Sequence, residues 1–277
     1  SDPDADRVGA AVKNNEGEWV LLNGNQTALM FVYYLITRWK ELGKINGKEY
    51  IVKTIVTTET IKTIAERNGV EMYDVYTGFK WIANVMRENE GKKNYIGGGE
   101  ESYGFLCEDF VRDKDAVSAC VILAEIAAWA KDQGLSLYQL LQKIYVEYGF
   151  SKEKGISVVK KGKSGAEEIE AMMKKFRENP LTEIAGSKVT YFYDYSTLKG
   201  KDYAENETVT LDMPTTSNVL QYFTEDNTKV SIRPSGTEPK IKFYCEVHSK
   251  VKSIDELPEA EKAAEEKINQ IKASLGI

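Results

Sequence analysis

Residues 50–75 read YIVKTIVTTETIKTIAERNGVEMYDV, and this stretch sets the fold class. The β-branched run over 50–57 predicts a strand, and residues 58–67 predict a helix that Asn68-Gly69 ends as a C-cap. Residues 70–75 predict the next strand. A strand, a helix and a second strand in succession indicate a largely parallel sheet, in which the loops after the carboxyl ends of the strands carry ligands.

The same alternation of helices and strands continues on both sides of this stretch. Further helices are predicted at 25–42, from Lys80 to about Glu88, at 116–131 and at 137–148. After Pro180 the pattern changes to strands at 188–195, 219–223, 229–233 and 240–247, followed by a helix over 254–275. We therefore expect an α/β fold, with a mostly parallel α/β domain followed by a smaller α+β domain that has an antiparallel sheet.

Composition narrows the classes of partner. The chain of 277 residues carries 37 basic and 43 acidic residues, and its net charge of −6 argues against a nucleic-acid surface. It shows no signal peptide and no apolar run of membrane length, so we expect a cytoplasmic protein without a membrane partner. The three cysteines are scattered singly, which predicts neither a disulfide framework nor a zinc site.

The octapeptide RPSGTEPK at 233–240 has the composition of a phosphate-binding loop. A phosphate dianion needs several converging donors, which a guanidinium fork, hydroxyls and backbone N–H groups around a glycine can supply. The alternative is an ordinary surface turn, since Pro, Ser, Gly and Thr are common in turns. The candidate phosphate ligands are Arg233, Ser235, Gly236, Thr237 and Lys240.

The opening heptapeptide SDPDADR predicts a site for a hard cation. Asp2, Asp4 and Asp6 place three carboxylates at alternate positions of a short loop, with Arg7 beside the last of them. Oxygen ligands with open positions for water or phosphate suit Mg²⁺. A calcium EF-hand is excluded because its sixth and twelfth positions would be Arg7 and Lys13. The alternative is a solvated acidic segment whose aspartates act as turn residues.

A third motif, GGGEESYG at 97–104, combines glycines with paired carboxylates and a hydroxyl. Carboxylate oxygens accept hydrogen bonds from sugar hydroxyls, and glycine allows the backbone to approach a ligand closely. The alternative is a glycine-rich hairpin or linker.

In chain order these three motifs resemble the metal loop, the sugar-recognition loop and the phosphate-binding loop of the α-D-phosphohexomutases. The resemblance implies reversible transfer of phosphate between C1 and C6 of a hexose phosphate, through a phosphoserine and a hexose 1,6-bisphosphate. It implies that Asp2, Asp4 and Asp6 hold Mg²⁺ and that Arg7 lies against the phosphate of the phosphoserine. It further implies that Glu100 and Ser102 hold ring hydroxyls, while the loop at 233–240 anchors the phosphate that is not reacting.

Two further assignments come from the same resemblance. The run Val111-Arg112-Asp113-Lys114-Asp115 resembles the segment that carries a proposed lysine general base, which would be Lys114. A lysine can act as a base only if neighbouring cations or burial lower its pKa, and a solvated charge run is the alternative. Thr77, Gly78 and Lys80 resemble another loop at the substrate cleft.

The resemblance also implies a domain order. Residues 1–17 would end a metal-binding second domain, 18–180 would form the third domain and 181–277 the fourth. The serine loop of the family, of the type Thr-x-Ser-His-Asn-Pro, has no counterpart here, because the only histidine, His248, is followed by Ser249. We therefore expect N-terminal domains of the same protein as partners, and we expect this chain alone to be inactive.

The preferred sugar is a separate question. Glu100-Glu101-Ser102-Tyr103-Gly104 follows the loop of the glucose branch, whereas the mannose and glucosamine branches usually show Gly-Glu-x-Ser-Gly-His. A phosphoglucomutase is thus expected, with phosphomannomutase and phosphopentomutase as alternatives. Two other classes are a phosphosugar-binding module without turnover and a purely structural segment, and the latter predicts that Arg233→Ala leaves phosphate affinity unchanged.

Overall fold

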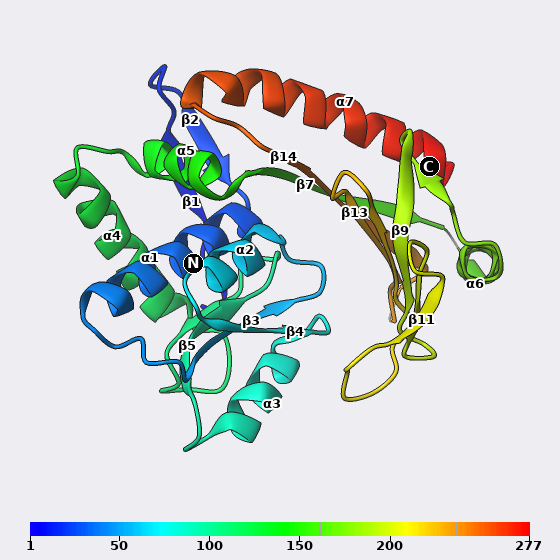
Figure 1. Cartoon of the computed structure of the whole chain (residues 1–277), viewed down its shortest axis with the longest axis horizontal. Helices are drawn as coiled ribbons and strands as arrows, with labels where there is room; N and C mark the ends of the chain where they lie inside the picture. Colours follow the sequence, from blue (N-terminus) through cyan, green and yellow to red (C-terminus); the bar gives the residue numbers. More distant parts are fainter. Residues whose placement is uncertain (161, 237) are drawn as a thin grey trace. The chain divides into compact units, whose positions relative to one another are not determined.

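The computed structural model describes residues 1–160, 162–236 and 238–277, which form two compact units (Figure 1). Unit 1 comprises Ser1–Phe150 with Val251–Ile254, and unit 2 comprises Ser151–Lys250 with Asp255–Ile277.

A four-stranded sheet forms the centre of unit 1, with the order β4-β3-β5-β6. Its strands are β3 (Glu49–Thr54), β4 (Glu71–Val75), β5 (Asn94–Gly99) and β6 (Phe105–Cys107). Strands β4 and β5 pair with β3 in parallel, and β6 pairs with β5 antiparallel. The predicted parallel sheet is confirmed, and β3 is buried along its whole length because it has a parallel neighbour on each side.

Five helices accompany this sheet: α1 (Gly24–Glu41), α2 (Thr60–Arg67), α3 (Phe79–Asn89), α4 (Ala116–Asp132) and α5 (Leu137–Tyr148). Their positions agree with the helices predicted from the sequence to within a few residues. Capping explains two of the starts. Asn23 with Gln26 forms a capping box at α1, and Ser136 with Gln139 forms one at α5.

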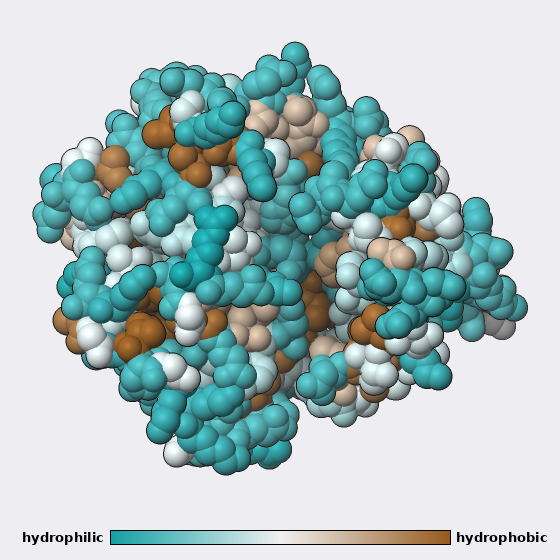
Figure 2. All heavy atoms as spheres, in the orientation of Figure 1, coloured by the Kyte–Doolittle hydropathy of each residue, from teal (hydrophilic) through white to brown (hydrophobic). Residues whose placement is uncertain are grey.

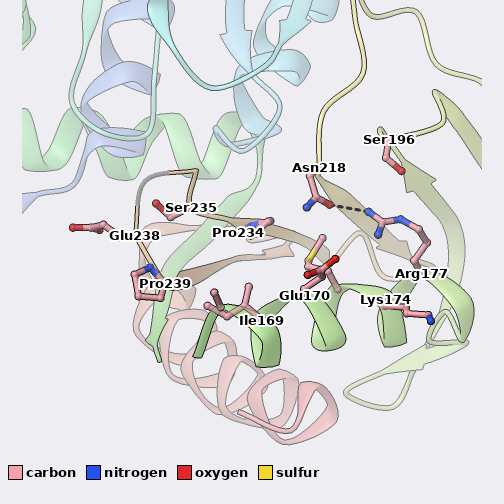
Figure 3. A pocket seen from close by; sticks show the side chains of 12 residues that line it. Ile169, Glu170, Lys174, Arg177, Ser196, Asn218, Pro234, Ser235, Glu238 and Pro239 are labelled. Atoms are coloured by element: carbon pink, nitrogen blue, oxygen red, sulfur yellow. Dashed lines mark hydrogen bonds between the residues drawn. The ribbon is translucent and has the colours of Figure 1, made fainter. Parts of the chain in front are cut away.

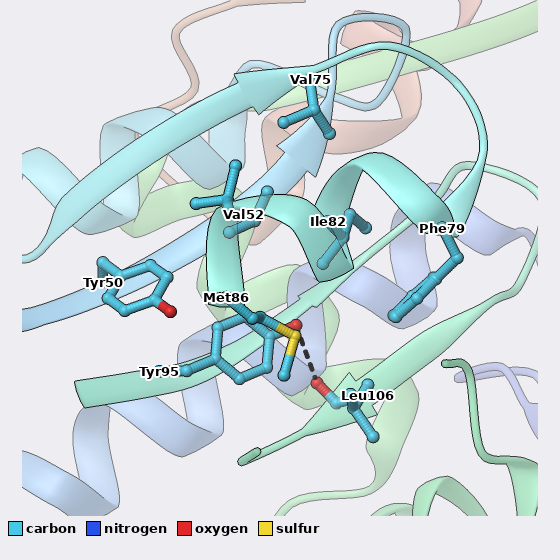
Figure 4. Packing of buried hydrophobic residues seen from close by; sticks show 9 residues of the cluster. Tyr50, Val52, Val75, Phe79, Ile82, Met86, Tyr95 and Leu106 are labelled. Carbon is cyan, nitrogen blue, oxygen red and sulfur yellow. Dashed lines mark hydrogen bonds between the residues drawn. The ribbon is translucent and has the colours of Figure 1, made fainter. Parts of the chain in front are cut away.

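The sheet of unit 1 is covered on both faces. Figure 4 shows the cluster beneath α3, which comprises Tyr50, Val52, Val75, Phe79, Ile82, Val85, Met86, Tyr95 and Leu106. On the other face α1 packs against β5 and β6, where Phe31 stacks on Phe105 with ring centroids 4.4 Å apart. The unit is therefore a three-layer α/β/α arrangement, with α3 and α1 on opposite faces of the sheet (Figure 1).

A short antiparallel hairpin, β1 (Ala10–Lys13) and β2 (Trp19–Leu22), precedes α1. Its Trp19 and Leu21 side chains are largely exposed. Hydrophilic residues dominate the molecular face drawn in Figure 2, with hydrophobic residues scattered among them. Among the residues that the structure describes, no helix is long and apolar enough to cross a membrane.

Unit 2 contains an eight-stranded sheet with the order β11-β10-β9-β12-β13-β14-β7, and β8 pairs with β9 off this path. The strands are β7 (Phe150–Val159), β8 (Glu183–Ile184), β9 (Ser187–Asp194), β10 (Lys199–Asp202), β11 (Glu207–Thr210), β12 (Leu220–Thr224), β13 (Lys229–Pro234) and β14 (Lys240–Ser249). Helix α6 (Gly162–Glu178) and helix α7 (Leu257–Leu275), which follows the 3-10 turn η1 (Ile254–Glu256), pack against β14. The strand pairs from β8 to β14 are antiparallel, as expected for the α+β domain at the end of the chain.

Several elements differ from the sequence-based expectation. The strand predicted over 50–57 ends at Thr54, because residues 55–59 turn into α2. Strand β7 and helix α6 were not predicted, and neither were the polar strands β10 and β11. Residues 151–180 lie in unit 2, whereas the sequence places the start of the last domain at 181, because β7 pairs with β14 at the edge of the antiparallel sheet.

The hairpin of β13 and β14 separates an apolar face from a polar one. Ile232 lies opposite Phe243, and both side chains are fully buried. On the alternate positions Lys229 lies opposite Glu246, and their Nζ and Oε2 atoms are 2.9 Å apart with both residues almost fully buried. The same register places Arg233 opposite Lys242, next to the loop that joins β13 to β14.

We predict that Ile82→Ala lowers the free energy of unfolding of unit 1 by about 2–5 kcal/mol, because Ile82 is fully buried between α3 and the sheet. Urea unfolding followed by tryptophan fluorescence measures this, since all four tryptophans lie in unit 1. The same substitution at the exposed Ile254 is the control and should cost about 0.5 kcal/mol or less. Equal losses for the two variants would contradict the assigned core.

Candidate functional site

The loops at the carboxyl edge of the parallel strands bring two predicted site segments together. The Gly78 N–H donates to Oε1 of Glu100 over 2.8 Å, which joins the loop after β4 to the loop after β5. The loop after β3 joins as well, because the Glu101 N–H donates to Oγ1 of Thr57 over 3.1 Å. Since β4 and β5 lie on opposite sides of β3, this edge is the topological switch point where open α/β sheets bind ligands.

Backbone conformation explains the place of Gly78. Its φ of 115° lies in the region that favours glycine, and it immediately precedes α3. The buried Glu100 carboxylate therefore accepts a backbone N–H at the N-terminus of a helix, where the dipole favours negative charge. Thr77, next to Gly78, and Ser102, two residues after Glu100, are partly buried. Lys80 is exposed, and its ammonium lies 5.0 Å from the centre of the Trp81 ring.

The aspartates at the start of the chain lie close together. One carboxylate oxygen each of Asp2, Asp4 and Asp6 lies within 4.8 Å of the others. Asp2 Oδ1 accepts from the N–H groups of Asp6 and Arg7, and its Oδ2 accepts from Arg7 Nε over 2.6 Å. Burial acts to raise the pKa of Asp2, but these hydrogen bonds outweigh it and lower that pKa to about 2. Asp2 is therefore ionised at neutral pH.

This acidic loop fits a magnesium ion. Oδ1 of Asp6 is buried and has no hydrogen-bond partner among the described residues, although Arg7 Nε lies 3.4 Å away. A buried carboxylate oxygen without a donor is costly unless a cation or water satisfies it. The oxygen-only ligand set suits a hard divalent ion.

The acidic loop is also attached to the loop at 100–104. Arg7 forms an antiparallel bridge with Gly104, and the Val8 N–H donates to the Tyr103 carbonyl over 3.2 Å. Lys114 Nζ lies 2.9 Å from Asp6 Oδ2. The structure thus brings the predicted metal loop, the predicted sugar loop and Lys114 into one site in unit 1.

Gly104 is required by this arrangement. A Cβ atom at position 104 would lie 2.4 Å from Lys114 Cδ and 3.2 Å from Glu100 Oε2. Only glycine allows both side chains to reach their places, so the glycine in the sequence motif is explained by close approach of side chains.

Two carboxylates pair with the ammonium of Lys114. Burial acts to lower the pKa of Lys114, but the ion pairs with Asp6 and Asp113 outweigh it and raise that pKa. Lys114 is held as an ammonium ion, 5.7 Å from the centre of the Phe79 ring.

The predicted phosphate loop joins β13 to β14 in unit 2. The Ser235 N–H donates to the Lys240 carbonyl and the Lys240 N–H donates to the Glu238 carbonyl, both over 2.7 Å. Gly236 is exposed, and Thr237 lies outside the described residues. The ammonium of Lys240 pairs with Glu238 over 2.9 Å.

Sequence reasoning missed Lys242, which the structure places directly across from Arg233. Because side chains alternate along a strand, Lys240 and Lys242 share one face of β14, while Ile241 between them is buried. The alternation of Lys240, Ile241 and Lys242 was the signal that could have found it. Three cations therefore belong to one face of the hairpin end: Arg233, Lys240 and Lys242.

A cavity of about 620 Å³ lies in unit 2 beside this loop (Figure 3). Residues of α6 line it together with Ser235 and Glu238 of the loop. Arg177 braces its wall, donating to Asp194 Oδ2 over 2.9 Å and to Asn218 Oδ1 over 2.8 Å. No pattern in the sequence indicated this cavity, because α6 was not predicted.

Two family models match most of the chain. The family model described as phosphoglucomutase/phosphomannomutase, alpha/beta/alpha domain III, matches residues 23–148. The model for the phosphoglucomutase/phosphomannomutase C-terminal domain matches residues 157–264. The chain belongs to the phosphoglucomutase/phosphomannomutase family. Residues 1–22, with the acidic loop, precede both matched regions.

Curated relatives of this family member are phosphoglucomutases, which are isomerases of carbohydrate metabolism. The phosphoglucomutase of Staphylococcus aureus (strain MRSA252) is 38% identical over 244 residues, covering 88% of this chain and 43% of the relative. That of Staphylococcus haemolyticus (strain JCSC1435) is 34% identical over 248 residues, covering 90% and 44%. The chain thus spans less than half the length of these relatives.

Solved structures agree with the phosphohexomutase fold. A putative phosphomannomutase from Thermus thermophilus superposes with a TM-score of 0.58 at 20% identity, covering 96% of this chain and 45% of that one. The parafusin phosphoglucomutase from Paramecium gives a TM-score of 0.58 at 17% identity, covering 97% and 44%. The expected α/β fold followed by an antiparallel-sheet domain is confirmed.

We predict that Gly104→Ala lowers the free energy of unfolding of unit 1 by about 1–3 kcal/mol, because the new methyl group overlaps Lys114. Adding Lys114→Ala to this variant should recover part of the loss, because the two positions are in contact. Urea unfolding by tryptophan fluorescence checks both. Gly9→Ala, where a Cβ meets nothing within 4 Å, is the control, and a Gly104→Ala variant as stable as it would refute the close approach.

Proposed function

We propose that this chain is part of a phosphohexomutase that interconverts glucose 1-phosphate and glucose 6-phosphate through a hexose 1,6-bisphosphate. The observation that carries the proposal is the convergence of the aspartate loop, the Glu100 loop and Lys114 in unit 1. The phosphoglucomutases among the relatives, at 34–38% identity, support the same activity.

The residues of unit 1 divide into three roles in this proposal. Asp2, Asp4 and Asp6 hold Mg²⁺, which supplies positive charge to phosphoryl oxygens when bound. Arg7, fixed by Asp2, adds a guanidinium for the phosphate of a phosphoserine. Glu100 and Ser102 hold ring hydroxyls, and Thr77, Gly78 and Lys80 form the adjoining loop, of which Gly78 orients the Glu100 carboxylate.

Lys114 is the proposed proton-transfer group. Each transfer moves a proton to or from a sugar oxygen, so a side chain that exchanges protons must be present. The raised pKa of Lys114 favours the step in which the ammonium donates its proton to the departing sugar oxygen. In the other transfer of the same cycle Lys114 would take the proton from the attacking sugar hydroxyl, so the proton it donates is replaced.

The phosphate loop of unit 2 supplies an anchor that recognises charge without reading the sugar. Arg233, Ser235, Gly236, Thr237 and Lys240 are the proposed ligands, and Lys242 extends the cationic face. Such an anchor can hold either phosphate of a bisphosphate, which suits a reaction in which the sugar is bound in two directions.

Residues 1–17 are proposed as the end of a second domain, since they precede the region matched by the domain III model. A serine loop of the family type has no match in the sequence, and the proposed partners are N-terminal domains of the same protein. A second candidate is phosphosugar binding without turnover. Mixing the chain with those domains distinguishes the two, because mutase activity appears only if the chain is part of the enzyme.

We predict that this chain binds glucose 1-phosphate, glucose 6-phosphate and glucose 1,6-bisphosphate, and that Arg233→Ala and Glu100→Ala each remove about 1.5–3 kcal/mol of binding free energy. Calorimetric titration measures the binding. Arg87→Ala on the surface of α3 is the control and should bind like the unchanged chain. If Arg233→Ala binds as tightly as Arg87→Ala, the loop at 233–240 is not a phosphate anchor.

We predict that Mg²⁺ binds at the aspartate loop and that Asp4→Asn weakens it by at least about tenfold, since even indirect supports of a metal site have effects of that size. Calorimetry with magnesium chloride checks this. Asp132→Asn, at the exposed end of α4, removes the same charge away from the loop and should leave the affinity unchanged. Equal affinities for the two variants would exclude the site.

A further inference from the structure

A buried lysine beneath the proposed sugar loop has no role in the reaction as proposed. Lys53, in β3, is 1% exposed. Its Nζ donates to Asp74 Oδ1 over 2.7 Å, to Glu59 Oε1 over 2.9 Å and to the Thr57 carbonyl over 3.4 Å. Lysine is almost never fully buried unless it is paired, and a buried ion pair adds little net stability compared with apolar packing. Its presence therefore calls for an explanation other than stability.

One contact of Lys53 leads to the loop after β4. Asp74 is the register partner of Lys53 in β4 and precedes the segment Val75-Tyr76-Thr77-Gly78. The ammonium thus fixes the end of the strand from which this loop starts. The Gly78 N–H at the end of the loop donates to the Glu100 carboxylate over 2.8 Å.

The other contacts lead to the loop after β5. Lys53 holds Glu59 and the Thr57 carbonyl, both in the turn after β3. Thr57 Oγ1 accepts the Glu101 N–H over 3.1 Å and lies 2.8 Å from Thr54 Oγ1, which donates to Glu101 Oε2 over 3.2 Å. Thr54 and Thr57 are fully buried, so water does not compete for these hydrogen bonds.

We propose that Lys53 is a positioning residue that ties the end of β4 to the turn after β3 and, through Thr57, sets the Glu100–Gly104 loop for sugar recognition. The inference rests on the proposed function only in naming the sugar as the ligand. Because its side chain is 1% exposed, Lys53 acts through Gly78 and Glu101 rather than by touching the substrate.

Unit 2 offers a matched control. Lys229 is also 1% exposed, lies in a strand and pairs with a buried carboxylate, Glu246, over 2.9 Å. Lys53→Met and Lys229→Met thus remove the same kind of buried cation from different units. The amides to follow by hydrogen exchange in NMR are those of Gly78 and Glu101, with Leu35 inside α1 as the reference.

We expect Lys53→Met to speed exchange at Gly78 and Glu101 by at least about tenfold relative to Leu35, the response to a lost charge-assisted hydrogen bond. Lys229→Met should leave both amides unchanged. The proposal is overturned if Lys53→Met changes the three amides of unit 1 equally, or leaves Gly78 and Glu101 as they are.

Two milder variants test the contacts of Lys53 with Asp74 and with Glu59 separately. They also test the proposal if Lys53→Met does not fold. Asp74→Asn should speed exchange chiefly at Gly78, and Glu59→Gln chiefly at Glu101, because each removes one charged partner of Lys53. A residue that merely stabilises unit 1 would affect both amides alike in both variants, and that pattern would refute the positioning role.

Calorimetric titration with glucose 1-phosphate completes the test. We expect Lys53→Met to bind more weakly than Lys229→Met. If it shows faster exchange but the affinity of Lys229→Met, the link from Lys53 to sugar recognition is wrong. If the unchanged chain binds no phosphosugar, the proposed function fails, while the exchange rates still decide whether Lys53 positions the loops.

Discussion

Unit 1 is organised by the burial of β3 between two parallel strands. A parallel strand needs a crossover on each side, so α2 and α3 must cover the sheet, and the ends of β3, β4 and β5 must lie at one edge. Thr57, Gly78 and Glu100 come together for this reason, although they are far apart in the sequence. The candidate site is thus a consequence of strand order.

Close approach is the second constraint, and it is met by glycine. At Gly104 no Cβ fits between Lys114 and Glu100, and at Gly24 a Cβ would lie 2.0 Å from the Glu101 carbonyl oxygen. Glycine at these two positions lets the Glu100 loop lie against Lys114 and against the start of α1. Charge then orders the site, since Arg7 and Lys114 each pair with carboxylates of the acidic loop.

In unit 2 the alternation of side chains along the antiparallel hairpin β13–β14 separates buried residues from cationic ones. Ile232, Ile241 and Phe243 are buried in the core, and the register places Arg233 across from Lys242 on the other face. The chain reverses immediately beyond, at the proposed phosphate loop. The sheet therefore presents the cationic side chains of Arg233 and Lys242 beside this loop.

Local patterns in the sequence were enough to predict the fold class, most helices, strands β3 and β4 and four strands of the antiparallel sheet, because periodicity, caps and turn residues encode these features within a few neighbouring positions. The same patterns did not reveal α6, the cavity beside it, Lys242 or Lys53. Nor did they indicate that Asp6 and Asp113 pair with Lys114 and raise its pKa. These points were settled by the folded chain alone, since burial, cross-strand register and charges distant in sequence act through space and leave no local pattern along the chain.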